Sequence, residues 1–159
     1  MKENLDRTGQ EIPDYQLAQF QLLVSELFRC CQERMQYQSE KFQLPDAEIR
    51  CLLLFGEDRY LTSKGIAYKL NVVKSRVTKI VDGLVHKNLV QRIRDPEDSR
   101  VTLLSLTLEG QKKVNSITEF LEYVHQETLR QMTVDQRKAV LSSLDLLRSS
   151  MKAVKELMV

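Results

Sequence analysis

The sequence predicts a mainly α-helical fold with a single β-hairpin, and three observations support it. Apolar residues recur at three- and four-residue steps over long stretches near both ends of the 159-residue chain. Two short helical patterns, separated by a sharp turn, lie between these stretches. Two β-rich segments around the turn-forming residues 95–99 then interrupt the helical pattern and predict the hairpin.

The first predicted helix follows a polar segment, residues 1–13, that lacks an apolar period and that we interpret as a mobile arm. From Asp14 to Glu40 one stripe of apolar residues has helical spacing: Leu17, Phe20, Val24, Leu27, Phe28, Cys31 and Met35. Pro45 suits the first turn of a second helix, in which Asp46 and Glu48 favour the positive end of the helix dipole. Gly56 is expected to end that helix.

Two short helices form the middle of the chain. Thr62 or Ser63 can cap a third helix that reaches Leu70, and Asn71 tolerates the left-handed conformation of a sharp turn. The fourth helix is expected from about Lys74 to His86. Its apolar residues share one side: Val77, Ile80, Val81 and Leu84. Asn88 is expected to end it in a left-handed conformation.

The hairpin and two long helices complete the chain. Residues 89–94 and 100–106 are the predicted strands, and Thr107 is expected to cap a helix from about Leu108 to Gln131. Thr133 and Gln136 have the spacing of a capping box that opens the last helix. Its apolar residues alternate four- and three-residue steps, which is typical of a helix that packs against another helix. We therefore predict a dimerisation surface on the first and last helices: Leu17, Phe20, Val24, Val140, Leu144, Leu147, Met151 and Val154.

Composition limits the possible classes of protein. With 42% hydrophobic and 29% charged residues, the chain is typical of a soluble folded protein and not of a disordered one. No run approaches the roughly 20 apolar residues of a membrane-spanning helix, and the N-terminus lacks the apolar core of a signal peptide. Three cysteines, an odd number, favour a reducing compartment. We expect a cytoplasmic protein with no membrane partner.

Positive charge is concentrated in one segment. Between Arg59 and Arg94 there are nine Lys or Arg residues and one acid, Asp82, whereas the rest of the chain has 15 basic and 21 acidic residues. This concentration is expected for a protein that binds a polyanion, and DNA is the first candidate. The alternative interpretation is a solvated basic helix face with no ligand.

Helix, turn, helix and hairpin in this order predict a winged helix-turn-helix. The hairpin contains Asp98-Ser99-Arg100, which is followed after five residues by Leu106-Thr107 and then Gly110. This pattern matches the D-x-R-x5-L-T-x-x-G wing signature of the MarR family of bacterial transcription regulators, which residues 62–110 resemble. The segment from Leu70 to Val90 also resembles the family's recognition helix, although Val73 replaces a small hydroxyl residue and Asn71 and Asn88 replace glycines. The cap of this helix is therefore expected to be weaker, unless Asn71 or Ser75 compensates.

The resemblance implies a homodimer whose terminal helices (residues 14–44 and 108–159) interlock and place two winged domains (45–107) on a pseudo-palindromic operator in double-stranded DNA. It also implies that the fourth helix enters the major groove and that the wing arginines lie against the backbone or in the minor groove. The residues that we expect at DNA are Ser63, Lys64, Lys74, Ser75, Arg76, Thr78, Lys79, Arg92, Arg94, Asp98 and Arg100. For Asp98, orientation of an arginine and turn formation alone are both open.

Effector sites are less specified by the sequence. Regulators of the family commonly bind small, often aromatic or anionic, molecules in a crevice between dimer helices and winged domain. The resemblance implies that Tyr37, Phe42, Tyr60 and Tyr68 can line such a crevice here, and a place in the core is the equal alternative for them. Cys30 and Cys31 are candidates for redox sensing. The alternative is that they are buried as small apolar residues, and this applies especially to Cys31, which lies on the apolar stripe. The histidines His86 and His125 and the cysteines have no metal-ligand spacing, and we expect no metal, cofactor or enzymatic activity.

Together these patterns predict a sequence-specific DNA-binding transcription regulator, a dimeric repressor released by a small ligand or an oxidant. The alternative is a winged-helix protein-interaction module that no longer binds an operator.

Overall fold

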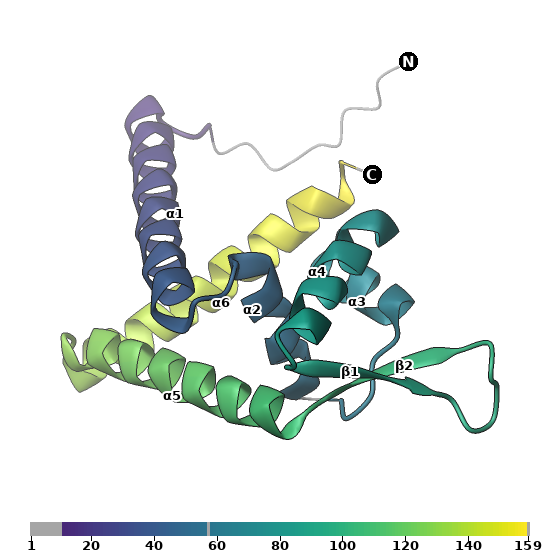
Figure 1. Ribbon diagram of the computed structural model, residues 1–159. Coiled ribbons are helices and arrows are strands. Elements are labelled where there is room, and N and C mark those ends of the chain that lie inside the picture. Colours follow the sequence, from purple (N-terminus) through teal and green to yellow (C-terminus); the bar gives the residue numbers. More distant parts are fainter. Residues whose placement is uncertain (1–10, 57, 159) are drawn as a thin grey trace, which may run out of the picture.

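The computed structural model describes residues 11–56 and 58–158, so most of the predicted mobile arm lies outside the described residues. The helices are α1 (Asp14–Phe42), α2 (Asp46–Leu53), α3 (Ser63–Leu70), α4 (Lys74–His86), α5 (Leu108–Arg130) and α6 (Val134–Glu156). A short 3-10 turn (Leu54–Gly56) extends α2, and the strands β1 (Val90–Arg94) and β2 (Thr102–Leu106) form one antiparallel hairpin. The predicted fold class and order of elements are confirmed (Figure 1).

The core is centred on α2. This helix contacts α1, α3, α4 and α5, and its residues Ile49, Cys51 and Leu52 are fully buried. Apolar residues from the surrounding elements complete the core: Ile66, Val77, Leu84, Leu104, Val114 and Ile117. Because α5 contributes to it, this core joins the winged domain to the base of the long helices.

Turns and caps form where the sequence predicts them. Asn71 (φ 53°) and Asn88 (φ 56°) are both left-handed and end α3 and α4. Thr62 and Thr107 accept hydrogen bonds from Gly65 N and Gly110 N, and Thr133 forms the capping box of α6 with Gln136. The weaker cap predicted at Val73 is confirmed, because no side-chain hydrogen bond caps α4 in the described chain.

The hairpin lies beside α4 and extends away from the long helices (Figure 1). Val90 pairs with Leu106 and Arg94 with Thr102, which sets the register of the two strands. Leu61 adds a single bridge to Leu104, with hydrogen bonds of 2.9 and 2.7 Å in the two directions. This bridge ties the start of α3 to the wing.

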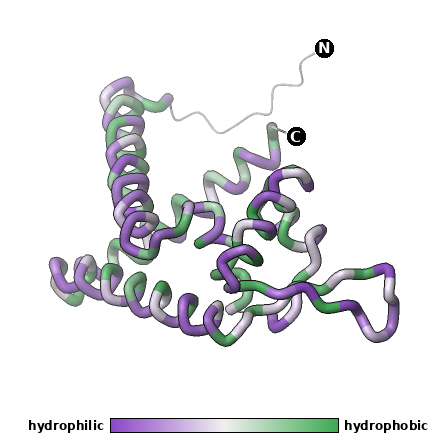
Figure 2. The backbone as a smooth tube through the Cα atoms, viewed as in Figure 1, coloured by the Kyte–Doolittle hydropathy of each residue, from purple (hydrophilic) through white to green (hydrophobic). Residues whose placement is uncertain are grey.

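The helices α1 and α6 leave most of their surface uncovered. Only Gln38 and Phe42 are buried in α1, and α6 has no buried residue in its described part. Figure 2 shows apolar residues along both helices. Phe20, Leu27 and Leu144 are among the apolar residues of these helices that are exposed. No helix in the described residues is long and apolar enough to cross a membrane.

Candidate nucleic-acid interface

The helix α4 has two chemically different sides. Val77, Ile80, Val81 and Leu84 are all buried against the core, as the sequence predicts. The opposite side exposes the polar and basic residues Lys74, Ser75, Arg76, Thr78 and Lys79. Of these, Ser75, Arg76 and Lys79 line a shallow open depression. An amphipathic helix of this kind offers hydrogen-bond donors to a polyanion while its other side remains packed.

Nine of the eleven basic residues of the winged domain fall into two groups; of the other two, Arg50 pairs with Asp46 and Arg59 lies over the ring of Tyr60. Lys64, Lys74, Arg76, Lys79 and Arg94 have no carboxylate partner within residues 11–56 and 58–158, so their charges are available to a ligand. The second group is paired. Lys69 binds Asp58, Lys87 binds Glu48, Arg92 binds Asp82 and Arg100 binds Asp98. The free charges are therefore those of the N-terminal half of α4, the start of α3 and the end of β1.

Arg92 differs from its predicted role as a free DNA contact. It lies on β1, and its guanidinium donates to the carboxylate of Asp82 on α4. This ion pair ties β1 to α4. Both side chains are about half-exposed, so the pair contributes mainly to relative orientation and little to stability.

The tip of the wing is built by two aspartates. Asp95 accepts a hydrogen bond from Glu97 N at 2.8 Å, and Asp98 accepts from Arg100 N at 3.0 Å and from Arg100 Nε at 3.1 Å. The guanidinium and then the backbone N–H of Arg100 hold the pKa of Asp98 below its ordinary value. Both roles left open for Asp98 are thus present together, because it shapes the turn and orients an arginine.

The remaining predicted DNA contacts have distinct positions. Lys64 is exposed in the first turn of α3, whereas Ser63 beside it is half-buried. Thr78 is exposed and its hydroxyl donates to Lys74 O at 3.2 Å, so the hydroxyl is bound within its own helix. Sequence reasoning did not identify Glu48 and Asp82 as partners of basic residues. Asp82 could have been found as the single acid in a basic segment.

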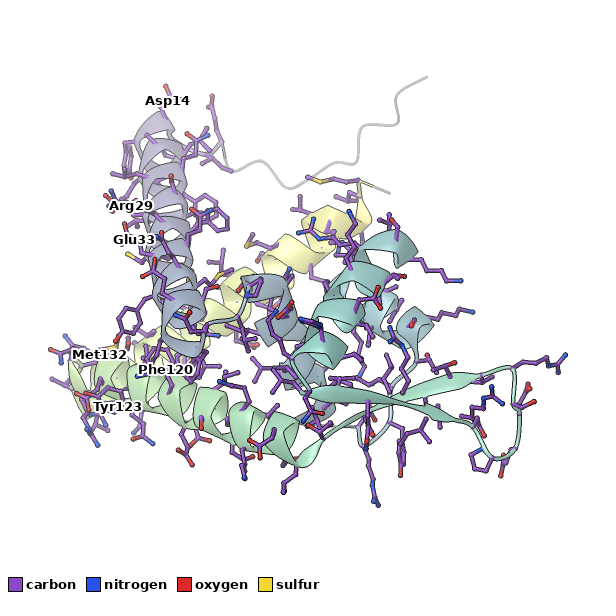
Figure 3. All side chains as sticks on the ribbon, viewed as in Figure 1. Asp14, Arg29, Glu33, Phe120, Tyr123 and Met132 are labelled. Carbon is purple, nitrogen blue, oxygen red and sulfur yellow. The ribbon has the colours of Figure 1, made fainter. Side chains whose placement is uncertain are left out.

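The predicted ligand crevice of four aromatic residues is wrong as a single site. Tyr37 stacks on Phe120 at 5.9 Å between ring centroids, and Phe42 meets the same ring edge-on at 5.7 Å. Phe120 projects from α5 near the base of α1 (Figure 3). Tyr60 instead lines a separate cavity of about 210 Å³ beside the hairpin, and Tyr68 is 88% exposed on α3. Only Tyr37 and Phe42 share a site.

Five of the eight predicted dimerisation residues face one another across a groove between α1 and α6. The groove has a volume of about 850 Å³, and its walls include Phe20 and Val24 from α1. From α6 come Leu147, Met151 and Val154. An apolar groove of this size in a single chain is expected to bind another apolar surface.

The thiols occupy two environments. Cys30 and Cys31 are exposed on α1, so the interpretation of Cys31 as a buried apolar residue is wrong for the single chain. Cys51 is buried, and burial, followed by the negative charge of Glu48, raises the pKa of its thiol to about 12. The described residues contain no group of three or more His, Cys, Asp or Glu side chains that could hold a metal ion.

Comparison with known proteins gives a consistent result. The MarR family model matches residues 44–102, which include α2, α3, α4 and β1. The chain is 28% identical over 102 residues to YdgJ, an uncharacterised HTH-type transcriptional regulator of Bacillus subtilis (strain 168). That match covers 64% of this chain and 62% of YdgJ, which is less than two thirds of its length.

The chain is 33% identical over 104 residues to the HTH-type transcriptional repressor MdtR of the same organism, and this match covers 65% of this chain and 67% of MdtR. The fold is similar to that of Streptococcus pneumoniae FabT, solved in complex with DNA. The TM-score is 0.76 at 17% identity, over 85% of this chain and 99% of FabT.

Proposed function

We propose that this chain, a DNA-binding transcription regulator that belongs to the MarR family, is a dimeric repressor that a small ligand or an oxidant releases from a pseudo-palindromic operator. The observation that carries the proposal is the exposed side of α4, where Lys74, Arg76 and Lys79 have no carboxylate partner in the described chain. Arg can read guanine edges in the major groove, whereas Lys mainly neutralises phosphate.

Dimerisation follows from the groove between α1 and α6. Its walls are almost wholly apolar, and water is a poor solvent for such a surface. A second copy of the chain presents the same two helices, so a two-fold axis can bury both grooves at once. Two copies of α4 would then meet successive major grooves, and the operator would share the two-fold symmetry of the protein.

Release by an effector is supported by the junction of α1 and α5. There, Lys41 Nζ lies 5.7 Å from the ring centroid of Phe120 and 6.0 Å from that of Phe42, beside the half-exposed Tyr37. A cation and aromatic faces together suit a small aromatic anion. The exposed Cys30 and Cys31 are the corresponding candidates for an oxidant. Because it must reach chromosomal DNA, the protein is placed in the cytoplasm.

Selection of bound fragments from the source genome, followed by sequencing, tests the proposal. We expect enrichment of a short inverted repeat, and a duplex that carries it should bind more tightly than random DNA by about 10³-fold or more. The bound species should contain two chains per site. Enrichment of no sequence would contradict operator binding and would favour the winged-helix interaction module, for which capture of a protein partner is the corresponding experiment.

A further inference from the structure

A partly buried ion pair joins the C-terminal end of α4 to α2 at the centre of the core. Lys87, at the C-terminal end of α4, donates from Nζ to both carboxylate oxygens of Glu48 on α2, at 2.9 and 2.7 Å. The Glu48 side chain is only 8% exposed and that of Lys87 is 37% exposed. Two charge-assisted hydrogen bonds from one ammonium add a directional link between the helices that apolar contacts lack.

Gly83 of α4 makes room for this pair. A Cβ atom at that position would lie 2.2 Å from Glu48 Oε1, which is too close for any side chain unless the carboxylate moves. The backbone of Gly83 is helical and not left-handed, so no conformational requirement explains a glycine there. Its small size instead lets the carboxylate of Glu48 cross α4 and reach Lys87 one turn later.

The pair lies between the two functional parts of the molecule. Its helix α2 contacts α1, which forms one wall of the apolar groove, and also contacts α4. The buried side of α4 is purely apolar, with Val77, Ile80, Val81 and Leu84, and such contacts are non-directional. Among the described contacts between α2 and α4, the ion pair is therefore the one with a defined direction.

We infer that Glu48 is a positioning residue for operator reading. Through Lys87 it fixes the C-terminal end of α4 relative to α2 and α1, and it keeps the Lys87 ammonium away from DNA phosphate. Glu48 thereby favours operator over random DNA without touching either. This inference rests on the proposed operator binding.

Two variants break the pair in different ways. Glu48→Gln removes the charge and releases Lys87, whereas Gly83→Ala keeps both charges but displaces the carboxylate. Each should weaken operator binding by about tenfold, because mutations of residues that connect two sites change the energetic coupling between those sites by a factor of this order. Binding to a random duplex should stay within about twofold for Gly83→Ala and should tighten for Glu48→Gln.

Salt dependence separates positioning from a general loss of fold. In Glu48→Gln the released Lys87 of each protomer can neutralise a phosphate, so the slope of log affinity against log salt on random DNA should steepen by about 2 per dimer. In Lys87→Gln the operator affinity should fall similarly, but the slope on random DNA should equal that of the wild type. A lost structural contact alone would not steepen the slope in one variant and leave it unchanged in the other.

Three controls keep the test decisive. Glu109→Gln makes the same substitution in the exposed ion pair of Glu109 with Lys112, and it should change neither the affinity for the operator nor that for random DNA. In a Glu48→Ala background, Gly83→Ala should produce no further loss on the operator. Thermal melting shows which variants fold. If Glu48→Gln does not fold, Gly83→Ala, which raises helix propensity, is the variant that tests the inference.

Equal loss on operator and random DNA in the folded variants, or no loss on either, would overturn the inference. A shallower slope in Lys87→Gln would also overturn it, because Lys87 would then contact phosphate in the wild type. Failure of the proposed function has a different signature, since the wild-type protein itself would not distinguish the selected site from random DNA.

Discussion

Two surfaces of this molecule are exposed in the single chain, and their chemistry is opposite. The outer side of α4 is polar and basic, with Arg76 and Lys79 unpaired in the described chain. The groove between α1 and α6 is lined by apolar residues such as Phe20 and Leu147. Exposure alone therefore does not define a function. A basic surface is stable in water and selects a polyanion, whereas an apolar groove is unfavourable in water and selects another apolar surface.

Within the winged domain a second contrast divides the cations. Counting charge from the sequence treats all nine basic residues between Arg59 and Arg94 alike. In the structure, Lys87 and Arg92 are held by acids from α2 and α4, while Lys74 and Arg76 are not. The paired cations link α4 to α2 and the wing to α4, and the unpaired ones remain available to DNA.

The largest effect is expected when charge enters the apolar groove. Leu144→Glu combined with Leu147→Glu places carboxylates on the predicted dimer surface of α6 and should abolish dimers, and operator binding with them. Sedimentation measures the mass of the species in solution. Ser142→Glu, on the same helix but outside the groove walls, is the matched control and should remain dimeric. A wild-type mass of one 18.5 kDa chain at micromolar concentration would contradict this account.

A smaller effect is expected on the basic side of α4. Arg76→Ala should cost about 1–3 kcal/mol on the operator and relax base preference at one position in each half-site, because a guanidinium can bind a guanine edge in two places. Competition binding with single-base operator variants measures both quantities. Circular dichroism and mass should show a folded dimer.

Arg94 at the end of β1 provides the comparison for Arg76. Arg94→Ala should weaken operator and random DNA by similar factors, of roughly 1 kcal/mol or less, because phosphate contacts carry little sequence information. The same competition assay applies. If Arg76→Ala left the preference for operator over random DNA unchanged while Arg94→Ala abolished that preference, the wing and not α4 would read the sequence.

The smallest expected effect concerns the thiols. At pH 8, Cys51 should not react with a thiol reagent until the protein unfolds, since burial and Glu48 raise its pKa to about 12. Its thiol stays neutral in the folded state, so its contribution to stability is complete below the ordinary pKa of 9.0 and is lost as the pH rises towards 12. Equal reaction rates for all three cysteines in the native protein would contradict this.

Local features of the fold could be predicted from the sequence, and features that depend on distant residues could not. The helix α4, its buried side, the left-handed Asn71 and Asn88 and the capping box at Thr133 follow from spacing and residue type within a few positions. Glu48 was predicted only to favour a helix dipole, but it pairs with a lysine 39 positions away.

The errors have the same origin. The four aromatic residues proposed for one crevice are separated because Tyr60 and Tyr68 belong to the winged domain, whereas Tyr37 and Phe42 pack on Phe120. Periodicity placed Cys31 on an apolar stripe, but Cys31 is exposed in the described chain, where only Gln38 and Phe42 of α1 are buried. An apolar stripe predicts which side of a helix is covered, but it does not predict whether the same chain or a second chain covers that side.

The most direct test of the central claim is the salt dependence of binding to the selected operator. If the unpaired cations of two protomers neutralise roughly 6–10 phosphates, log affinity should fall with log salt with a slope between about −5 and −9. Replacing Lys74 and Lys79 together by Gln should make that slope shallower by about 4 per dimer, because each cation is expected to neutralise one phosphate. A wild-type slope near zero, or a slope that this double variant leaves unchanged, would contradict the claim that the exposed side of α4 faces DNA.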